Sequence, residues 1–220
     1  MVLPGFVHSP STQFLVWAGS TGVGMYAVKL ASLVGYKVVT VASKRNWGLV
    51  KSLGAAAVFD YHDPDVISSI KTWVQEQGLG PLKKGLDTIS ENGSQEKSVE
   101  LLGEGGRLIT LCKDVLILLL KAGFHLFVFS VPSPKNFDSK GVDVHRVLIY
   151  SALKPKNEDD FRQMVEWNKE ILPAYLESEK LSKGVVPLKV FSGGLDHLPE
   201  ALDYVRQGKT SGQKVVVTLK

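Results

Sequence analysis

One strand–turn–helix–strand unit near the start of the chain constrains its fold more than any other feature. A short apolar run, residues 14–18, leads into the turn Gly-Ser-Thr-Gly-Val-Gly at 19–24. Apolar residues then recur at helical spacing as far as Gly35, and residues 37–42 form a continuous, largely β-branched run. A unit of about 30 residues with this order is a βαβ crossover, which joins two parallel strands in a right-handed sense.

The same alternation continues along the chain and predicts the fold class. Apolar strands alternate with amphipathic helices, which indicates an α/β protein with a doubly wound parallel sheet, the Rossmann arrangement. The second half is less regular. The further strands predicted are 57–59, 86–89, 107–111, 142–150, 188–191 and 214–219, and the further helices are 47–53, one opened by Pro64, 95–102, 158–176 and 198–205.

Composition excludes several classes of protein. The 220 residues are 44% hydrophobic and 22% charged, an ordinary globular balance. The net charge of +4 is spread along the chain, so no nucleic-acid partner is expected. The single cysteine, Cys112, and five scattered histidines predict neither an internal disulfide nor a metal site. With no signal-peptide pattern at the N-terminus, a reduced, cytoplasmic protein is expected.

Residues 112–131 stand out as an apolar segment. The segment is short for a membrane span and carries Lys121 and His125 near its middle, so no membrane partner is expected. Its abrupt apolar composition, between two blocks that resemble a known family, favours translated intron or another gene-model error. If the segment is genuine, an extra core helix or strand is the alternative.

The glycine turn predicts a dinucleotide site. Glycines let the backbone approach a pyrophosphate, which the N–H groups at the start of the helix then bind. The second strand ends in Ser43-Lys44-Arg45-Asn46, without the carboxylate that an NAD site places there. Two cations attract a 2′-phosphate, so NADP(H) is the predicted cofactor. The alternatives are a tight packing turn and two exposed surface cations.

Several ordered motifs carry a family resemblance. Together with the glycine turn they are the Lys-Ser-Leu-Gly-Ala at 51–55, the Val-Phe-Asp-Tyr at 58–61, residues 86–91, residues 105–111 and the closing 208–217. In these blocks the chain resembles the medium-chain dehydrogenase/reductase superfamily. It is most similar to the zinc-independent branch of quinone reductases and trans-acting enoyl reductases, which work with fungal polyketide synthases.

The resemblance implies an activity, a cofactor and a set of cofactor contacts. The activity is NADPH-dependent hydride transfer to an activated C=C bond of a small enoyl thioester, enone or quinone-like substrate. No catalytic residue is implied. The partners implied are a polyketide synthase or a second copy of the chain. The cofactor contacts implied are Ser20, Thr21, Gly22 and Val23 at the pyrophosphate, Ser43, Lys44, Arg45 and Asn46 at the 2′-phosphate, Tyr61 at the adenosine, Ser90 and 109–111 beside the nicotinamide ribose, and Thr210 and Ser211 closing over the cofactor.

The chain departs from the family at its start. Family members carry a GroES-like catalytic domain before the nucleotide-binding domain, whereas this chain begins almost at the first Rossmann strand. We therefore expect a leader at 1–13, an NADP-binding domain at 14–184 and a C-terminal segment at 185–220 that would pack on the mostly missing domain. Strands 188–191 and 214–219 are expected to lose partners. The alternative to an enzyme is a non-catalytic NADP-binding remnant, or a fragment that needs a partner chain.

One pair of residues and one single residue allow other functional interpretations. Tyr150 and Lys154 imitate the catalytic pair of short-chain dehydrogenases, but Pro155 disfavours the shared helix that this pair requires. Asp87, at the end of a predicted strand, fits either a functional carboxylate or one that caps its own loop.

Overall fold

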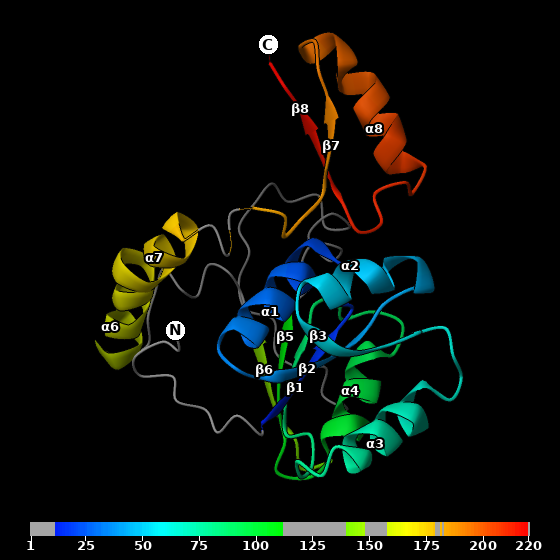
Figure 1. Ribbon diagram of the computed structural model, residues 1–220, viewed down its shortest axis with the longest axis vertical. Helices are drawn as coiled ribbons and strands as arrows, with labels where there is room; N and C mark the ends of the chain where they lie inside the picture. Colours follow the sequence, from blue (N-terminus) through cyan, green and yellow to red (C-terminus); the bar gives the residue numbers. More distant parts are fainter. Residues whose placement is uncertain (1–11, 112–139, 148–157, 179–180, 182, 220) are drawn as a thin grey trace, which may run out of the picture.

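The computed structural model describes residues 12–111, 140–147, 158–178, 181 and 183–219 (Figure 1). The predictions for residues 112–131, Tyr150 and Lys154 lie outside these residues, as does all but the end of the predicted leader. No helix in the described ranges is both long and apolar enough to cross a membrane.

A six-stranded sheet forms the centre of the molecule. Its strands are β1 (Gln13–Trp17), β2 (Lys37–Val41), β3 (Ala55–Phe59), β4 (Lys84–Asp87), β5 (Arg107–Leu111) and β6 (Asp143–Val147). They lie in the order β3-β2-β1-β4-β5-β6, and every neighbouring pair is parallel. The order reverses between β1 and β4, so the doubly wound sheet is confirmed.

Helices cover both faces of this sheet (Figure 1). They include α1 (Gly22–Leu33), α2 (Trp47–Ser52), α3 (Val66–Glu76) and α4 (Ser94–Leu102). Neighbouring strand residues point to opposite faces, so Val16 packs with Val28 of α1 while Leu15 packs with Ile70 of α3. With a core on each side, the central strands β1 and β2 are mostly apolar instead of alternating, which is why they could be found in the sequence.

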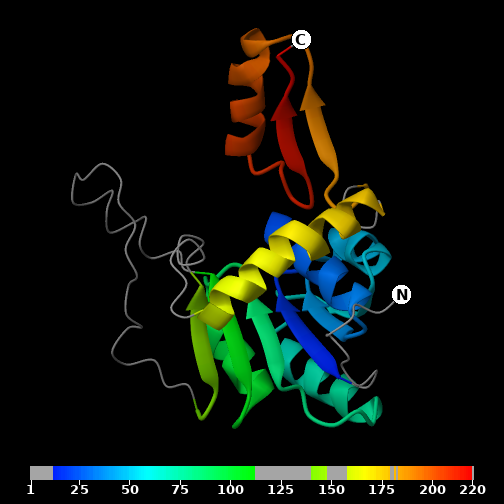
Figure 2. The same cartoon turned by 90° about the vertical axis from the view of Figure 1, so that its left-hand side faces the viewer.

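A second helical run crosses the face that carries α1 (Figure 2). It consists of α6 (Glu158–Glu166), a π-helical stretch at Trp167–Ile171, and α7 (Leu172–Glu177). The sequence predicts one uninterrupted helix at 158–176. The π-helical turns went unpredicted because a wider turn changes the hydrogen bonding without breaking the apolar stripe.

The C-terminal part forms a small unit of its own. It contains β7 (Leu188–Phe191), a 3-10 turn at Leu195–His197, α8 (Leu198–Arg206) and β8 (Lys214–Val217). Both views show β7, α8 and β8 projecting from the main body (Figures 1 and 2). These two strands pair with each other in parallel, and the loss of partners from a missing catalytic domain stays a prediction.

The observed β4 is shifted from the predicted strand at 86–89. The strand ends at Asp87 because its carboxylate Oδ1 accepts the backbone N–H groups of Ile89 and Ser90, both at 3.0 Å. These bonds turn the backbone out of the sheet, and Ser90 takes a left-handed φ of 52°. A β-branched pair, Thr88 and Ile89, thus lies in a loop despite its strand propensity.

Candidate functional site

The glycine turn follows β1 at the point where the strand order reverses. The loop after β4 lies beside it, since β4 is the other neighbour of β1. In open parallel sheets, this crevice beyond the carboxyl ends of the strands is where ligands bind. The fold therefore places the predicted dinucleotide turn at the sheet edge that such a ligand requires.

Thr21 begins α1 as its N-cap. Its Oγ1 accepts the N–H of Gly24 at 3.0 Å, and its carbonyl accepts the N–H of Met25 at 2.8 Å. Four N–H groups at a helix start have no partner within the helix, so Thr21 leaves those of Gly22 and Val23 for a ligand. Both of these residues are exposed.

Two glycines of the turn have different surroundings. A Cβ built on Gly24 would lie 2.2 Å from the carbonyl oxygen of Ala18, so this position requires glycine. A Cβ on Gly22 would meet nothing within 4 Å. The turn is thus closely packed on its inner side and open on the side where the free N–H groups lie.

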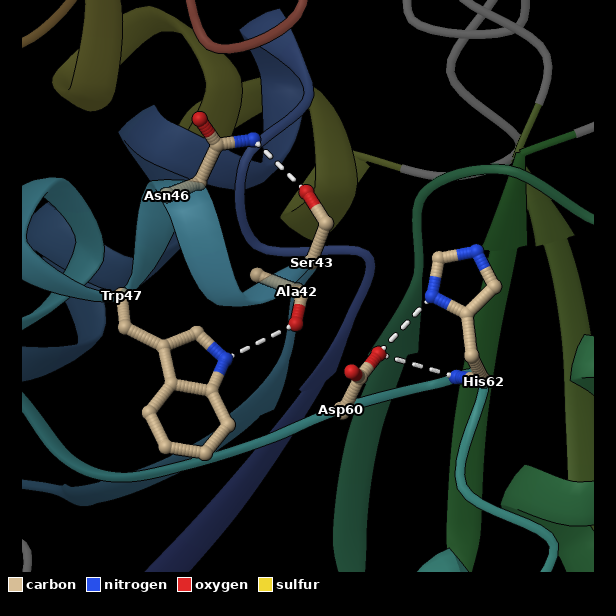
Figure 3. Close-up of polar contacts among 6 residues, drawn as sticks. All are labelled: Ala42, Ser43, Asn46, Trp47, Asp60 and His62. Atoms are coloured by element: carbon tan, nitrogen blue, oxygen red, sulfur yellow. Dashed lines mark hydrogen bonds and ion pairs between the residues drawn. The ribbon is translucent and has the colours of Figure 1, made fainter.

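The loop after β2 carries the predicted 2′-phosphate residues. Lys44, Arg45 and Asn46 form a 3-10 turn, in which Lys44 and Arg45 are exposed and Asn46 is only 7% exposed. The loop is fixed from below by the indole Nε1 of Trp47, which donates to the Ala42 carbonyl at 3.0 Å (Figure 3). Two cations are therefore held at the surface on a braced turn.

Asn46 joins this loop to the C-terminal unit. Its Nδ2 donates to the hydroxyls of Ser43 at 3.2 Å and of Ser211 at 2.9 Å. Gly212 packs against it, because a Cβ there would lie 2.8 Å from the Asn46 Oδ1. Three of the predicted site residues are thus directly bonded, and the amide hydrogens of Asn46 are given to protein partners. Thr210 lies half-buried in the same turn as Ser211.

Tyr61 lies at the end of β3, next to a carboxylate–histidine pair. Its exposed ring stacks on the His62 ring, with the centroids 3.9 Å apart. The Asp60 carboxylate accepts the backbone N–H of His62 at 3.0 Å and contacts its ring Nδ1 at 2.9 Å (Figure 3). These bonds hold the pKa of Asp60 below its ordinary value, and the charge of Lys44 lowers it further.

The loop after β4 is organised by Asp87, which is fully buried. Besides the two N–H groups after the strand, its carboxylate accepts the Ser94 hydroxyl at 2.6 Å, at the start of α4. Of the two interpretations of Asp87, the structure therefore favours the loop cap. The Ser90 hydroxyl, predicted beside the nicotinamide ribose, is buried without a hydrogen-bond partner, and so is that of Thr110 within the 109–111 stretch of β5.

Some neighbours of the predicted residues were missed from the sequence. Thr88 bonds to Thr21 at 2.9 Å between their hydroxyl oxygens, across 67 positions of sequence. The contact between Asp60 and His62 was also missed: Asp60 belongs to the Val-Phe-Asp-Tyr block, and His62 is one of the five scattered histidines. Thr21 and Thr88 lie too far apart in the sequence to form a local pattern, and a histidine two residues after an aspartate does not by itself indicate a contact.

The residues present fit NADP(H). The open side of the glycine turn offers N–H groups to a pyrophosphate, and two exposed cations with the Ser43 hydroxyl suit a 2′-phosphate. The described residues contain no candidate metal site, since no three or more of their His, Cys, Asp or Glu side chains lie close enough together to hold a metal ion.

Comparisons with known proteins agree with this fold. The family model described as zinc-binding dehydrogenase matches residues 22–170. The trans-enoyl reductase ACTTS2 of Alternaria alternata is 32% identical over 221 residues, which cover 97% of this chain and 57% of that protein. This chain thus spans little more than half the length of that relative.

Solved structures show the same arrangement. The CurF ER cyclopropanase of the curacin A biosynthetic pathway matches with a TM-score of 0.68 and 19% identity, over 98% of this chain and 57% of that one. The Etr1p/NADP/crotonyl-CoA complex matches with a TM-score of 0.62 and 20% identity, over 99% of this chain and 57% of that one. At these identities the similarity establishes the fold alone.

Proposed function

Because the chain belongs to the zinc-binding dehydrogenase family, within the medium-chain dehydrogenase/reductase superfamily, we propose that it binds NADP(H) and acts as the cofactor-binding part of an enoyl reductase. Bound NADPH supplies a hydride to an activated carbon–carbon double bond. The substrate class proposed is a small enoyl thioester, enone or quinone-like molecule, and a polyketide synthase is the proposed partner. The similarity to a trans-enoyl reductase supports this assignment.

The observation that carries the proposal is the pairing of two anion sites at one sheet edge. The N–H groups of Gly22 and Val23 would bind the pyrophosphate, with Ser20 and Thr21 lining the same turn. Lys44 and Arg45 would bind the 2′-phosphate, with Ser43 donating its hydroxyl. In this arrangement Asn46 holds Ser43 in place, Tyr61 lies on the adenosine side, and Thr210 and Ser211 close the turn above.

The domain division remains part of the proposal. Residues 14–184 would form the NADP-binding domain. Residues 185–220 would pack on a catalytic domain, for which the greater length of the relatives is sufficient. The main support is apolar exposure on the C-terminal unit: Leu188, Leu195 and Leu219 are 60%, 65% and 72% exposed. Such a concentration of exposed leucines is typical of a surface that another protein segment covers.

This exposed surface also favours a second candidate function. The chain would then be an NADP-binding protein without activity by itself, or a fragment that works only with a partner chain. The two candidates share the cofactor site and differ in whether the purified chain turns over a substrate.

Titration of the purified chain with NADPH and NADH, followed by fluorescence, tests the cofactor site. NADPH should bind more tightly than NADH, and Lys44→Ala should weaken NADPH binding by about tenfold while leaving NADH unchanged, because it removes a charge-assisted hydrogen bond. Lys71→Ala removes the same charge from α3, where Lys71 pairs with Glu100, and serves as the control. Equal binding of the two cofactors would contradict the 2′-phosphate assignment.

An oxidation assay then separates the candidates. With NADPH and an enone or enoyl thioester, slow turnover by the purified chain would favour the enoyl reductase, whereas NADPH binding without turnover would favour the inactive NADP-binding protein or the fragment that needs a partner chain. Turnover at the rate of a complete enoyl reductase would overturn the view that this chain supplies only the cofactor-binding part.

A further inference from the structure

The residue just before the glycine turn has a backbone conformation that its side chain does not favour. Ala18, between β1 and the turn, has a φ of 64°. The left-handed region is uncommon for a residue with a Cβ, and such strain persists only where the surroundings hold it. Its conformation directs the Ala18 carbonyl toward the start of α1, where it lies so close to Gly24 that no Cβ fits between them.

Two threonine hydroxyls hold the Ala18 carbonyl. The Oγ1 of Thr21 lies 3.0 Å from this oxygen, and the Oγ1 of Thr88 lies 3.1 Å from it. The Thr88 Oγ1 also lies 2.9 Å from the carbonyl oxygen of Trp17, so its one hydrogen is shared between these two acceptors, and the two hydroxyl oxygens are 2.9 Å apart. Each hydroxyl has one hydrogen, and this set of carbonyls and hydroxyls gives each of them an acceptor.

The two threonines come from opposite sides of the reversal in strand order. Thr21 begins α1 after β1, whereas Thr88 follows β4, and these two strands are neighbours in the sheet. Thr88 therefore braces the glycine turn from the loop that faces it across the crevice. The brace acts on the residue before the turn and on the helix cap, which together set the direction of the free N–H groups of Gly22 and Val23.

We propose that Thr88 is a positioning residue for the cofactor pyrophosphate, acting through Ala18 and Thr21. The inference rests on the proposed NADP(H) site. It assigns to the loop after β4 a part in pyrophosphate binding, through a hydroxyl that itself touches no cofactor. By this account, loss of the hydroxyl leaves the 2′-phosphate loop intact and lets the glycine turn relax.

Calorimetric titration with two probes tests the proposal. NADPH engages both anion sites, whereas adenosine 2′-monophosphate engages the Ser43–Arg45 loop without a pyrophosphate. Thr88→Val removes the hydroxyl and keeps the shape of the side chain. It should raise the Kd for NADPH by about tenfold, as expected for lost hydrogen bonds, and change the Kd for adenosine 2′-monophosphate by less than about twofold.

The controls make every outcome decisive. Thr88→Ser retains the hydroxyl and should bind NADPH within about twofold of the unchanged protein, and Thr88→Ala replaces Thr88→Val if the latter does not fold. NADPH binding that is unchanged in Thr88→Val, or equal losses for both probes, would overturn the positioning role alone. Failure of the unchanged, folded protein to bind NADPH would overturn the proposed cofactor site, and this inference with it.

Discussion

Replacing Gly24 by alanine should damage the glycine turn more than its small size suggests. The added Cβ would lie 2.2 Å from the Ala18 carbonyl oxygen, 2.8 Å from the Thr21 Oγ1 and 2.9 Å from the Gly19 Cα. Two of these three atoms belong to the backbone, so no side-chain rotation relieves the contact. The turn and the first residues of α1 must move apart by about 1 Å to reach ordinary contact distance.

The cost can be estimated from what that movement breaks. Overpacking at a close-packed site typically costs about 1–3 kcal/mol. The shift also separates the Gly24 N–H from the Thr21 Oγ1, now 3.0 Å apart, and losing an N-cap bond costs about 1 kcal/mol. We therefore expect Gly24→Ala to lower the free energy of unfolding by about 2–4 kcal/mol, which lowers the Tm by about 5–15 °C in a chain of this length.

Thermal unfolding followed by circular dichroism measures this effect. Gly48→Ala is the matched control, because Gly48 is also helical and a Cβ there meets nothing within 4 Å. The control should keep or raise the Tm, since alanine is a better helix former by up to about 1 kcal/mol. A Gly24→Ala protein as stable as the Gly48→Ala protein would refute the close packing of the turn.

Three further changes probe the surroundings of the site and the core. Asp60→Asn should make stability depend less on acid pH. The pKa of Asp60 is lowered in the folded protein, so its carboxylate contributes stability above pH 3.8, and this contribution is lost as the pH falls through the folded pKa. Over this pH range the Tm of the unchanged protein should therefore fall more steeply than that of the variant. Trp47→Phe removes the 3.0 Å bond from Nε1 to the Ala42 carbonyl and should cost about 1 kcal/mol in urea unfolding, with no loss expected if the indole bond contributes nothing. Leu108→Ala, at a fully buried position of β5, should cost about 2–5 kcal/mol, and a smaller loss would show that the core closes around the cavity.

The main sheet was largely predictable because its strands bury both faces. The run that forms β5 matches the observed bounds Arg107–Leu111, and the helix after the glycine turn was located from its periodicity. The end of β4 was misplaced because a side chain determines it. The Asp87 carboxylate accepts the N–H groups of Ile89 and Ser90, which are then not available for strand pairing. Periodicity carries no information on such local bonds.

The site was predictable only where it is local in sequence. The glycine turn and the two cations after β2 occur as short, contiguous patterns. The bond from Asn46 to Ser211 spans 165 positions, and nothing near either residue indicates that their side chains meet. The same holds for Thr21 and Thr88, whose contact follows from the strand order and not from spacing.

Calorimetric titration of the folded chain with NADPH and with NADH tests the central claim most directly. The free N–H groups after Thr21 and the cations at Lys44 and Arg45 predict saturable binding of NADPH, tighter by about tenfold than that of NADH. The absence of heat with either reduced or oxidised NADP, from protein shown to be folded, would contradict the account.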